Sequence, residues 1–186
     1  MLSLGLLLQQ TLGFVTCFLY ASFFEWTFHR FVMHNPDVWS YPFRAHTLVH
    51  HGVFRFDRSY HLQRDEDKGF VTFAWWNAPV LLALHAPFVL GTQALSGLQI
   101  FWGGITAMCF YYFLYEYLHF VMHVPRNRWI ERTALFRWLN AHHRNHHKRH
   151  DRNLNVVLPL PDWLFGTLVI PAKPDADTLR RECPRK

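Results

Sequence analysis

Histidine spacing constrains this chain more than any other feature of its sequence. The chain has 14 histidines among 186 residues, and ten of them fall into four tight clusters. The clusters are His29 with His34; His46, His50 and His51; His119 with His123; and His143, His146 and His147. Intervals of three or four residues place two imidazoles on one helix face, and imidazole is the commonest metal ligand among side chains. Four such clusters predict a site that holds more than one metal ion.

Three apolar runs are long enough to cross a bilayer, which takes about 20 residues. They extend over Leu2–Phe28, Phe70–Leu90 and Leu98–Leu118, and the connection Gly91–Gly97 between the last two is uncharged. We therefore predict an all-α fold, an integral-membrane helical bundle of about three spans plus interfacial helices. A soluble protein with buried helices is the alternative that these runs disfavour.

The basic residues indicate how the spans are oriented. All 19 Lys and Arg residues lie within Arg30–Lys68 or from Arg126 onward. By the positive-inside rule both segments face the cytoplasm, so the chain starts outside and ends inside. Every histidine except His85 then lies at or beyond the cytoplasmic end of a span, where we place the dimetal site. This topology accounts for the basic charge, and no nucleic-acid partner is expected.

The sequence predicts a single membrane domain over residues 1–186, with a core at 25–167 and a polar tail at 168–186. No linker or low-complexity break divides it. The first apolar run has no positive segment before it, so a cleaved signal peptide is not expected. No organelle-targeting signal is evident, which favours a bacterial inner membrane.

Two stretches of the chain are similar to each other and suggest an internal duplication. Residues 25–34 and 116–123 each begin with glutamate and end with Phe-Val-Met-His, and a doublet-bearing cluster follows each. His29 and His34 are five apart, roughly 140° around an ideal helix, so we expect a helix end or bulge there. Between Trp129 and His150, an apolar stripe continues as histidines, which predicts a helix whose histidine face points inward.

Several polar residues have more than one interpretation. Glu25 and Glu116 lie three or four residues before a cluster histidine, so we expect each to accept a hydrogen bond from a ligating imidazole or to bind metal directly. An ion pair with an arginine is the alternative. His142 competes with His143 for one role, and His61 and His150 are either extra ligands or surface residues. His85 is expected to be structural. Residues 158–167 are expected to lie on or dip into the membrane interface.

All-nitrogen ligation suits iron, zinc or copper. A pair of redox metals beside the hydrocarbon layer suggests O2 activation for attack on an unactivated C–H bond of an acyl or isoprenoid chain. No serine or cysteine nucleophile, Gly-rich phosphate loop or zinc-protease helix is evident in the sequence. The rival interpretations are a non-redox zinc protein and a transporter, although a transporter would favour ionisable groups near mid-membrane.

The four clusters resemble the histidine boxes of the fatty acid hydroxylase superfamily, which includes sterol desaturases, C-4 sterol methyl oxidases and fatty acid 2-hydroxylases. The likeness covers Glu25–Thr167, and Asn155–Thr167 is similar to the family's tail after the last box. The resemblance implies a membrane-bound, non-haem di-iron monooxygenase that hydroxylates or desaturates a fatty acyl or sterol-like lipid. The ten clustered histidines would hold two iron ions, or zinc in the protein as isolated, and O2 would be the co-substrate.

Two departures from the superfamily affect these expectations. Its members commonly have four spans in two hairpins, whereas the first apolar run here is long enough for one. The cytochrome b5 domain that some fatty acid 2-hydroxylases carry is also absent, so the electrons would come from a separate cytochrome b5, ferredoxin or reductase. The small size and single leading span are similar to bacterial carotenoid β-ring hydroxylases, which keeps a carotenoid as the alternative substrate.

Overall fold

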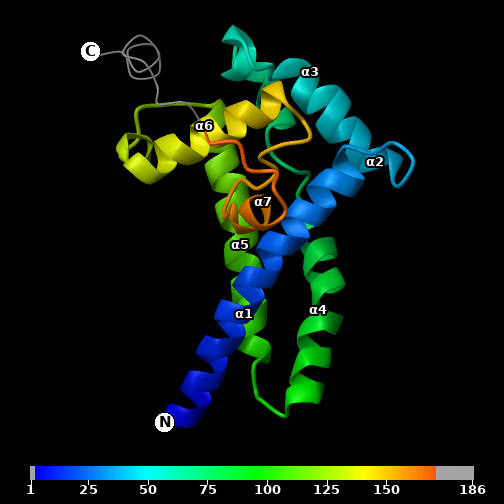
Figure 1. Cartoon of the computed structure of the whole chain (residues 1–186), viewed down its shortest axis with the longest axis vertical. Helices are drawn as coiled ribbons and strands as arrows, with labels where there is room; N and C mark the ends of the chain where they lie inside the picture. The colour runs from blue at the N-terminus through cyan, green and yellow to red at the C-terminus, as the bar shows by residue number, and fades with distance from the viewer. Residues whose placement is uncertain (1–2, 171–186) are drawn as a thin grey trace.

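The structure is a computed structural model that describes residues 3–170. Every regular element in this part of the chain is a helix, which confirms the all-α prediction. Three long helices, α1 (Leu4–Phe28), α4 (Asn77–Ser96) and α5 (Phe101–His123), run along the long axis of the molecule (Figure 1). The shorter elements gather at the end away from the N-terminus. Most of the predicted tail lies outside the described residues.

Two stretches of helix are long and apolar enough to cross a membrane, Leu4–Met33 and Asn77–Ser96. Only 17% and 11% of their most apolar windows are buried, whereas the core helix of a soluble protein would be mostly covered. Their exposed apolar side chains need a lipid environment. The third expected span, α5, is as long but ends in the polar Glu116, His119 and His123. Its crossing of the membrane stays a prediction.

The second span begins and ends later than the sequence indicated. The segment before it does not continue as helix, and the backbone N–H of Phe73 donates instead to the Glu116 carboxylate at 3.3 Å. At the other end the helix continues through Gly91 and stops at Gly97, whose φ of 69° is left-handed. Glycine tolerates that conformation, which commonly ends a helix. The predicted connection 91–97 is therefore mostly helical.

Helix α5 packs along α1, and α4 packs on α5. Glycines allow α1 and α5 to approach closely: a Cβ at Gly13 would lie 2.7 Å from the Ile100 carbonyl oxygen, and one at Gly103 would overlap the Gln10 carbonyl. From this contact toward the histidine-bearing end, the interface is filled by a cluster that includes Cys17, Ala107 and other apolar side chains. The pair forms the frame on which the histidine-bearing end is built.

That end is made of short elements around one longer helix. The short elements are η1 (His29–Met33), α2 (Ser40–Phe43), η2 (Arg44–His50), α3 (His51–Val53), η3 (Arg58–Tyr60), η4 (Asp65–Phe70), η5 (Ile130–Arg132) and α7 (Leu160–Leu164). The longer helix, α6 (Ala134–Lys148), begins after Thr133, whose hydroxyl accepts the Phe136 N–H at 3.2 Å. This helix is shorter than the predicted 129–150, so His150 lies beyond it.

Candidate metal centre

The ten clustered histidines converge into two groups, each of which could hold a metal ion. The first group is His29, His34, His46, His51 and His146; the second is His50, His119, His123, His143 and His147. Within each group one ring nitrogen per residue lies within 4.8 Å of all the others. No carboxylate or cysteine belongs to either group among the described residues.

The two groups draw on the two halves of the chain in the same way. The first half supplies four members of the first group and contributes His50 to the second. The second half supplies four members of the second group and contributes His146 to the first. This exchange is what an internal duplication would produce, and it ties the four clusters into one centre.

Two π-helical segments explain why the first-half clusters contain an extra residue. His29–Met33 and Arg44–His50 are π-helices, in which the repeat is wider than in an α-helix. The five-residue interval from His29 to His34 therefore brings the rings together, with centroids 5.0 Å apart. In the second half, His119 and His123 achieve the same placement with a four-residue interval on the regular helix α5. The bulge predicted at His29 is thus a π-helical segment.

Backbone carbonyls orient several of the imidazole rings by contacting the ring nitrogen that faces away from the group. Five members contact a carbonyl oxygen through Nδ1, which fixes Nε2 as the nitrogen that faces the group. The pairs are His29 with Leu154, His146 with Arg152 (2.9 Å), His50 with Phe70 (2.9 Å), His123 with Tyr60 (2.7 Å) and His147 with Phe54 (2.5 Å). The first group is thereby held by residues 152–154, and the second by residues 54–70. In addition, the Nδ1 atom of His34 lies 2.9 Å from the Thr47 hydroxyl.

A buried carboxylate fixes the carbonyls behind the first group. Asp162 accepts the N–H groups of Leu154 and Asn155, both at 2.9 Å, and the Thr167 hydroxyl at 2.6 Å. Burial acts to raise the pKa of Asp162, but these bonds and one from His142 outweigh it and hold that pKa below 3.8. Asp162 was not among the predicted site residues. An acidic residue inside the apolar stretch 158–165 is a signal that could have found it, since a buried charge needs partners.

The two carboxylates expected beside the imidazoles, Glu25 and Glu116, contact other groups in the structure. Glu25 accepts hydrogen bonds from the Tyr111 hydroxyl at 2.5 Å, the Asn155 amide at 3.1 Å and the Val156 N–H at 2.5 Å. Glu116 accepts the Phe73 N–H. Within the described residues neither carboxylate contacts an arginine or a histidine, and a role for either beside a metal-bound imidazole stays a prediction. The carboxylates instead anchor backbone segments, and Glu25 acts on the segment that orients His29.

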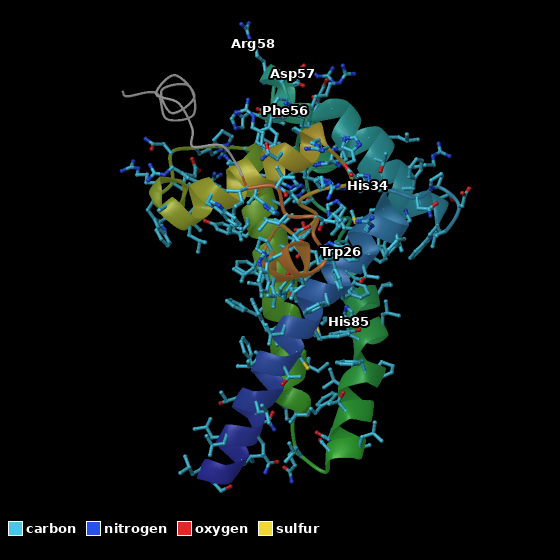
Figure 2. The ribbon with its side chains drawn as sticks, in the orientation of Figure 1. Trp26, His34, Phe56, Asp57, Arg58 and His85 are labelled. Atoms are coloured by element: carbon cyan, nitrogen blue, oxygen red, sulfur yellow. The ribbon has the colours of Figure 1, made fainter. Side chains whose placement is uncertain are left out.

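The remaining histidines have distinct surroundings. His142, rather than competing with His143, contacts Asp162 through Nε2 at 3.2 Å. His150 lies over the first group, with its ring centroid 4.2 Å from that of His51, but is not a member of it. His61 contacts Tyr60. His85 lies apart from the groups, on the side of Trp26 away from His34 (Figure 2). It contacts the Tyr20 hydroxyl at 3.4 Å, in the structural role predicted for it.

The imidazoles are neutral, as metal ligation requires. Burial lowers the pKa of His50 to about 4. Burial, together with repulsion from neighbouring imidazoles, holds the pKa values of His143 and His147 well below their usual range. The same causes act on His46 and His51 in the first group. Each ring therefore presents a lone pair.

One pair tests whether these residues fit a metal ion. His50 and His147 both donate Nδ1–H to carbonyls, so their Nε2 atoms both carry lone pairs, yet those atoms face each other 3.3 Å apart. Two acceptors cannot bond to each other, whereas a shared cation would satisfy both. Across the two groups, neighbouring Nε2 atoms are 2.8–3.3 Å apart. Two nitrogens at right angles on one ion, each about 2.1 Å away, are about 3 Å apart. The residues fit a metal.

Comparison with known proteins agrees with this geometry. The pattern of the fatty acid hydroxylase family matches residues 14–167. The chain belongs to the fatty acid hydroxylase family. Members of this family depend on a metal. A dihydroceramide fatty acyl 2-hydroxylase of Arabidopsis thaliana is 29% identical to this family member over 150 residues, which are 79% of this chain and 56% of the relative. The chain thus spans about half the length of that relative. No solved structure matches it.

Proposed function

We propose that this chain is a membrane-bound, O2-dependent, non-haem di-iron oxidoreductase that hydroxylates a C–H bond in the acyl chain of a membrane lipid. The observation that carries the proposal is the pair of five-histidine groups at the end of apolar helices. Structural zinc takes four ligands, so five neutral imidazoles in each group favour iron, which imidazole also suits. All ten histidines are assigned as ligands in this proposal.

The reaction consumes one O2 and two electrons. Balanced, it reads R–H + O2 + 2 e⁻ + 2 H⁺ → R–OH + H2O: one C–H bond breaks, one C–O bond forms, and the second oxygen leaves as water. Iron, when bound, supplies the activation of O2. The electrons come from a separate one-electron donor protein, and the protons come from solvent.

The chain's own residues hold the centre and keep water from it. Nine of the ten histidines are buried, and His34 alone is partly open. The carbonyls of residues 54–70 and 152–154 keep the lone pairs directed inward, so that little reorganisation is needed when metal binds. Water exclusion matters because it protects reactive intermediates from side reactions.

The position of the centre indicates which part of a lipid it reaches. His29 follows α1 directly, and His119 and His123 lie in the last turns of α5. These positions are at the ends of the membrane helices, level with the polar end of a lipid, so the carbons nearest the head group reach them most easily. The name of the Arabidopsis thaliana relative, a fatty acyl 2-hydroxylase, supports hydroxylation in this same region of the lipid's acyl chain. The concentration of Lys and Arg at this end supports a cytoplasmic location.

The test combines metal analysis with lipid analysis. The protein, purified in mild detergent after expression with ⁵⁷Fe, should contain about two irons per chain and give the Mössbauer signal of a coupled pair. Expressing cells grown under ¹⁸O2 should accumulate lipids that carry one labelled hydroxyl on the acyl chain. A His119→Ala variant should lack the labelled product.

Other outcomes separate the rival functions. Labelled hydroxyl found only on the ring of a carotenoid, in a host supplied with one, would replace the acyl substrate by a carotenoid. Zinc that persists after iron-replete expression, with no labelled product, would reject the oxygenase and leave a non-redox zinc protein.

A further inference from the structure

A cationic patch lies at the end of the molecule opposite the N-terminus of α1 and the connection between α4 and α5. Its members, hereafter the Phe56 patch, are Arg55, Phe56, Arg58, Arg144 and Lys148. Figure 2 places Phe56 and Arg58 at that extremity, with Trp26 and His85 far along the molecule toward the spans. Phe56 is 36% exposed, so part of this aromatic residue is open to solvent among the charged side chains.

Two cations of α6 lie over the exposed ring. The Arg144 guanidinium carbon is 5.5 Å from the Phe56 centroid, and the Lys148 ammonium nitrogen is 4.9 Å from it. Such contacts hold long, flexible side chains in place at a surface. The patch is thus ordered, with an aromatic centre and a cationic rim, which is the usual composition of a protein-binding surface.

The patch carries a strong positive charge. It has four cations, Arg55, Arg58, Arg144 and Lys148, and Asp57 lies between the first two in the chain. That carboxylate is engaged locally, because it accepts the N–H and the hydroxyl of Ser59 at 2.9 and 2.8 Å. Beside it lies a hollow of about 620 Å³, which Arg55, Asp57 and Arg58 help to line. The surface is therefore suited to an acidic partner with a protruding contact.

The loop that carries Phe56, residues 54–60, also orients two histidines of the second group. Two residues before Phe56, the carbonyl of Phe54 accepts the His147 Nδ1–H at 2.5 Å. Four residues after Phe56, the carbonyl of Tyr60 accepts the His123 Nδ1–H at 2.7 Å, and the Tyr60 ring lies 5.6 Å from the Arg144 guanidinium. Phe54 and Tyr60 are buried, so one layer of side chains separates the patch from the histidines.

We propose that the Phe56 patch is the docking surface for the electron donor, a small acidic protein that carries a one-electron centre. This inference rests on the proposed function, which needs two electrons per turnover. Each docked donor gives up one electron and leaves oxidised, so that two encounters complete a turnover. The patch attracts the donor electrostatically and brings its centre to the shortest route to the second group, through the 54–60 loop.

A membrane surface is the competing partner for a cationic patch. Anionic head groups attract clusters of Lys and Arg beside a membrane. Phe56 and Arg58, however, lie at the extremity away from the bundle, beyond His34 (Figure 2). A protein arriving from solvent reaches this surface more directly than a lipid does.

The test uses the full-length, iron-loaded protein in detergent and an acidic plant-type [2Fe–2S] ferredoxin as the probe. Oxidation of pre-reduced ferredoxin is followed at the ferredoxin's own absorbance, and binding is measured across a salt series. The Arg55→Glu/Arg58→Glu variant should slow ferredoxin oxidation by about tenfold or more and remove most of its salt dependence. An Arg132→Glu/Arg137→Glu variant carries the same change of net charge away from the patch, and it should resemble the wild type.

Reduced methyl viologen, a small organic reductant, separates the possible failures. Both charge variants should retain wild-type iron content and wild-type rates with methyl viologen. Equal slowing of both variants with ferredoxin, or no slowing of the patch variant, would overturn the proposal. So would a patch variant that binds ferredoxin normally but loses binding to phosphatidylserine vesicles, because that result would assign the patch to the membrane. If the wild type forms no product even with methyl viologen, the proposed function fails, whereas ferredoxin binding still reports on the patch.

Discussion

His50 and His51 are adjacent in the chain, yet their imidazoles belong to different histidine groups. The Nε2 atom of His51 lies 3.0 Å from that of His46, whereas the Nε2 atom of His50 lies 3.3 Å from that of His147. Successive residues of a helix point about 100° apart, so a doublet placed between two ions can serve both. His146 and His147 divide in the same way. The doublets are thus the residues that connect the two groups.

This division predicts different metal losses from neighbouring substitutions. His51→Ala should release the ion of the first group and His50→Ala that of the second, so each variant should retain about one iron per chain. Mutation of a group that hydrogen-bonds to a metal ligand typically lowers activity by roughly 10–100-fold. Loss of the ligand itself should lower the activity of both variants at least as strongly. Elemental analysis gives the count, and the Mössbauer spectrum should change from a coupled pair to a single uncoupled site.

His61→Ala is the matched control, because His61 belongs to neither group. It should retain both ions and the coupled spectrum. Loss of both ions in each doublet variant, with His61→Ala intact, would contradict independent sites and indicate a centre that forms only as a whole.

Local sequence patterns predicted the parts of this structure that local geometry decides. The four-residue interval of His119 and His123 requires only a regular helix, and α5 provides it. The inward histidine face of α6 followed from the periodicity of Leu139, His143 and their neighbours, and these residues are buried. Even the irregular turn at His29 was visible, because an α-helix cannot bring residues five apart to one face.

Long-range partners were not predictable in the same way. The carbonyl of Leu154 contacts His29, 125 residues earlier in the chain, and any residue type could supply that carbonyl. The hydrogen-bond partners of Glu25 could not be predicted for a related reason, since Tyr111, Asn155 and Val156 contact it only after the helices pack. The start of α4 was also missed, because an apolar segment does not reveal whether its backbone hydrogen bonds lie within a helix.

Asp162→Asn should loosen the first group selectively. The amide nitrogen would replace an acceptor oxygen that faces buried N–H groups, and leaving such donors unsatisfied costs about 1–3 kcal/mol each. The first group should bind its ion more weakly, by about 10–100-fold, because residues 152–154 hold His29 and His146. Competition with a chelator at the two sites measures this. Equal weakening of both groups would contradict the assignment.

The same residue gives a pH dependence with a definite sign. Because the pKa of Asp162 is held below 3.8 in the folded protein, its contribution to stability is fully present at higher pH and is lost as pH falls below that value. Chemical unfolding of the metal-free protein should therefore show a smaller loss of stability on acidification in Asp162→Asn than in the wild type. Thr167→Val removes the hydroxyl that donates to the Asp162 carboxylate and accepts the Trp26 indole N–H, but keeps the charge of Asp162. It should therefore retain the acid-induced loss.

Glu25→Gln should increase the mobility of residues 152–156, which Glu25 anchors, without affecting residues 54–70. An amide cannot accept hydrogen bonds with both of its polar atoms, so at least one of the donors Tyr111, Asn155 and Val156 loses its partner. Hydrogen exchange followed by mass spectrometry should be faster over residues 152–156 and unchanged over residues 54–70. Faster exchange over both segments would mean that Glu25 supports the fold as a whole.

Gly103 should be the position at which α1 and α5 tolerate least additional volume. A Cβ there would overlap the Gln10 carbonyl of the facing helix, so Gly103→Ala must push the two backbones apart, at a cost of about 1–3 kcal/mol. Gly91 in α4 is the matched control, because no atom lies within 4 Å of its Cβ position. Gly91→Ala should instead stabilise the helix by about 0.5–1 kcal/mol. Thermal unfolding in detergent measures both changes. If the two variants unfolded at the same temperature, α1 and α5 would not be packed as closely as the structure shows, and the frame that aligns His29 with His119 would need another explanation.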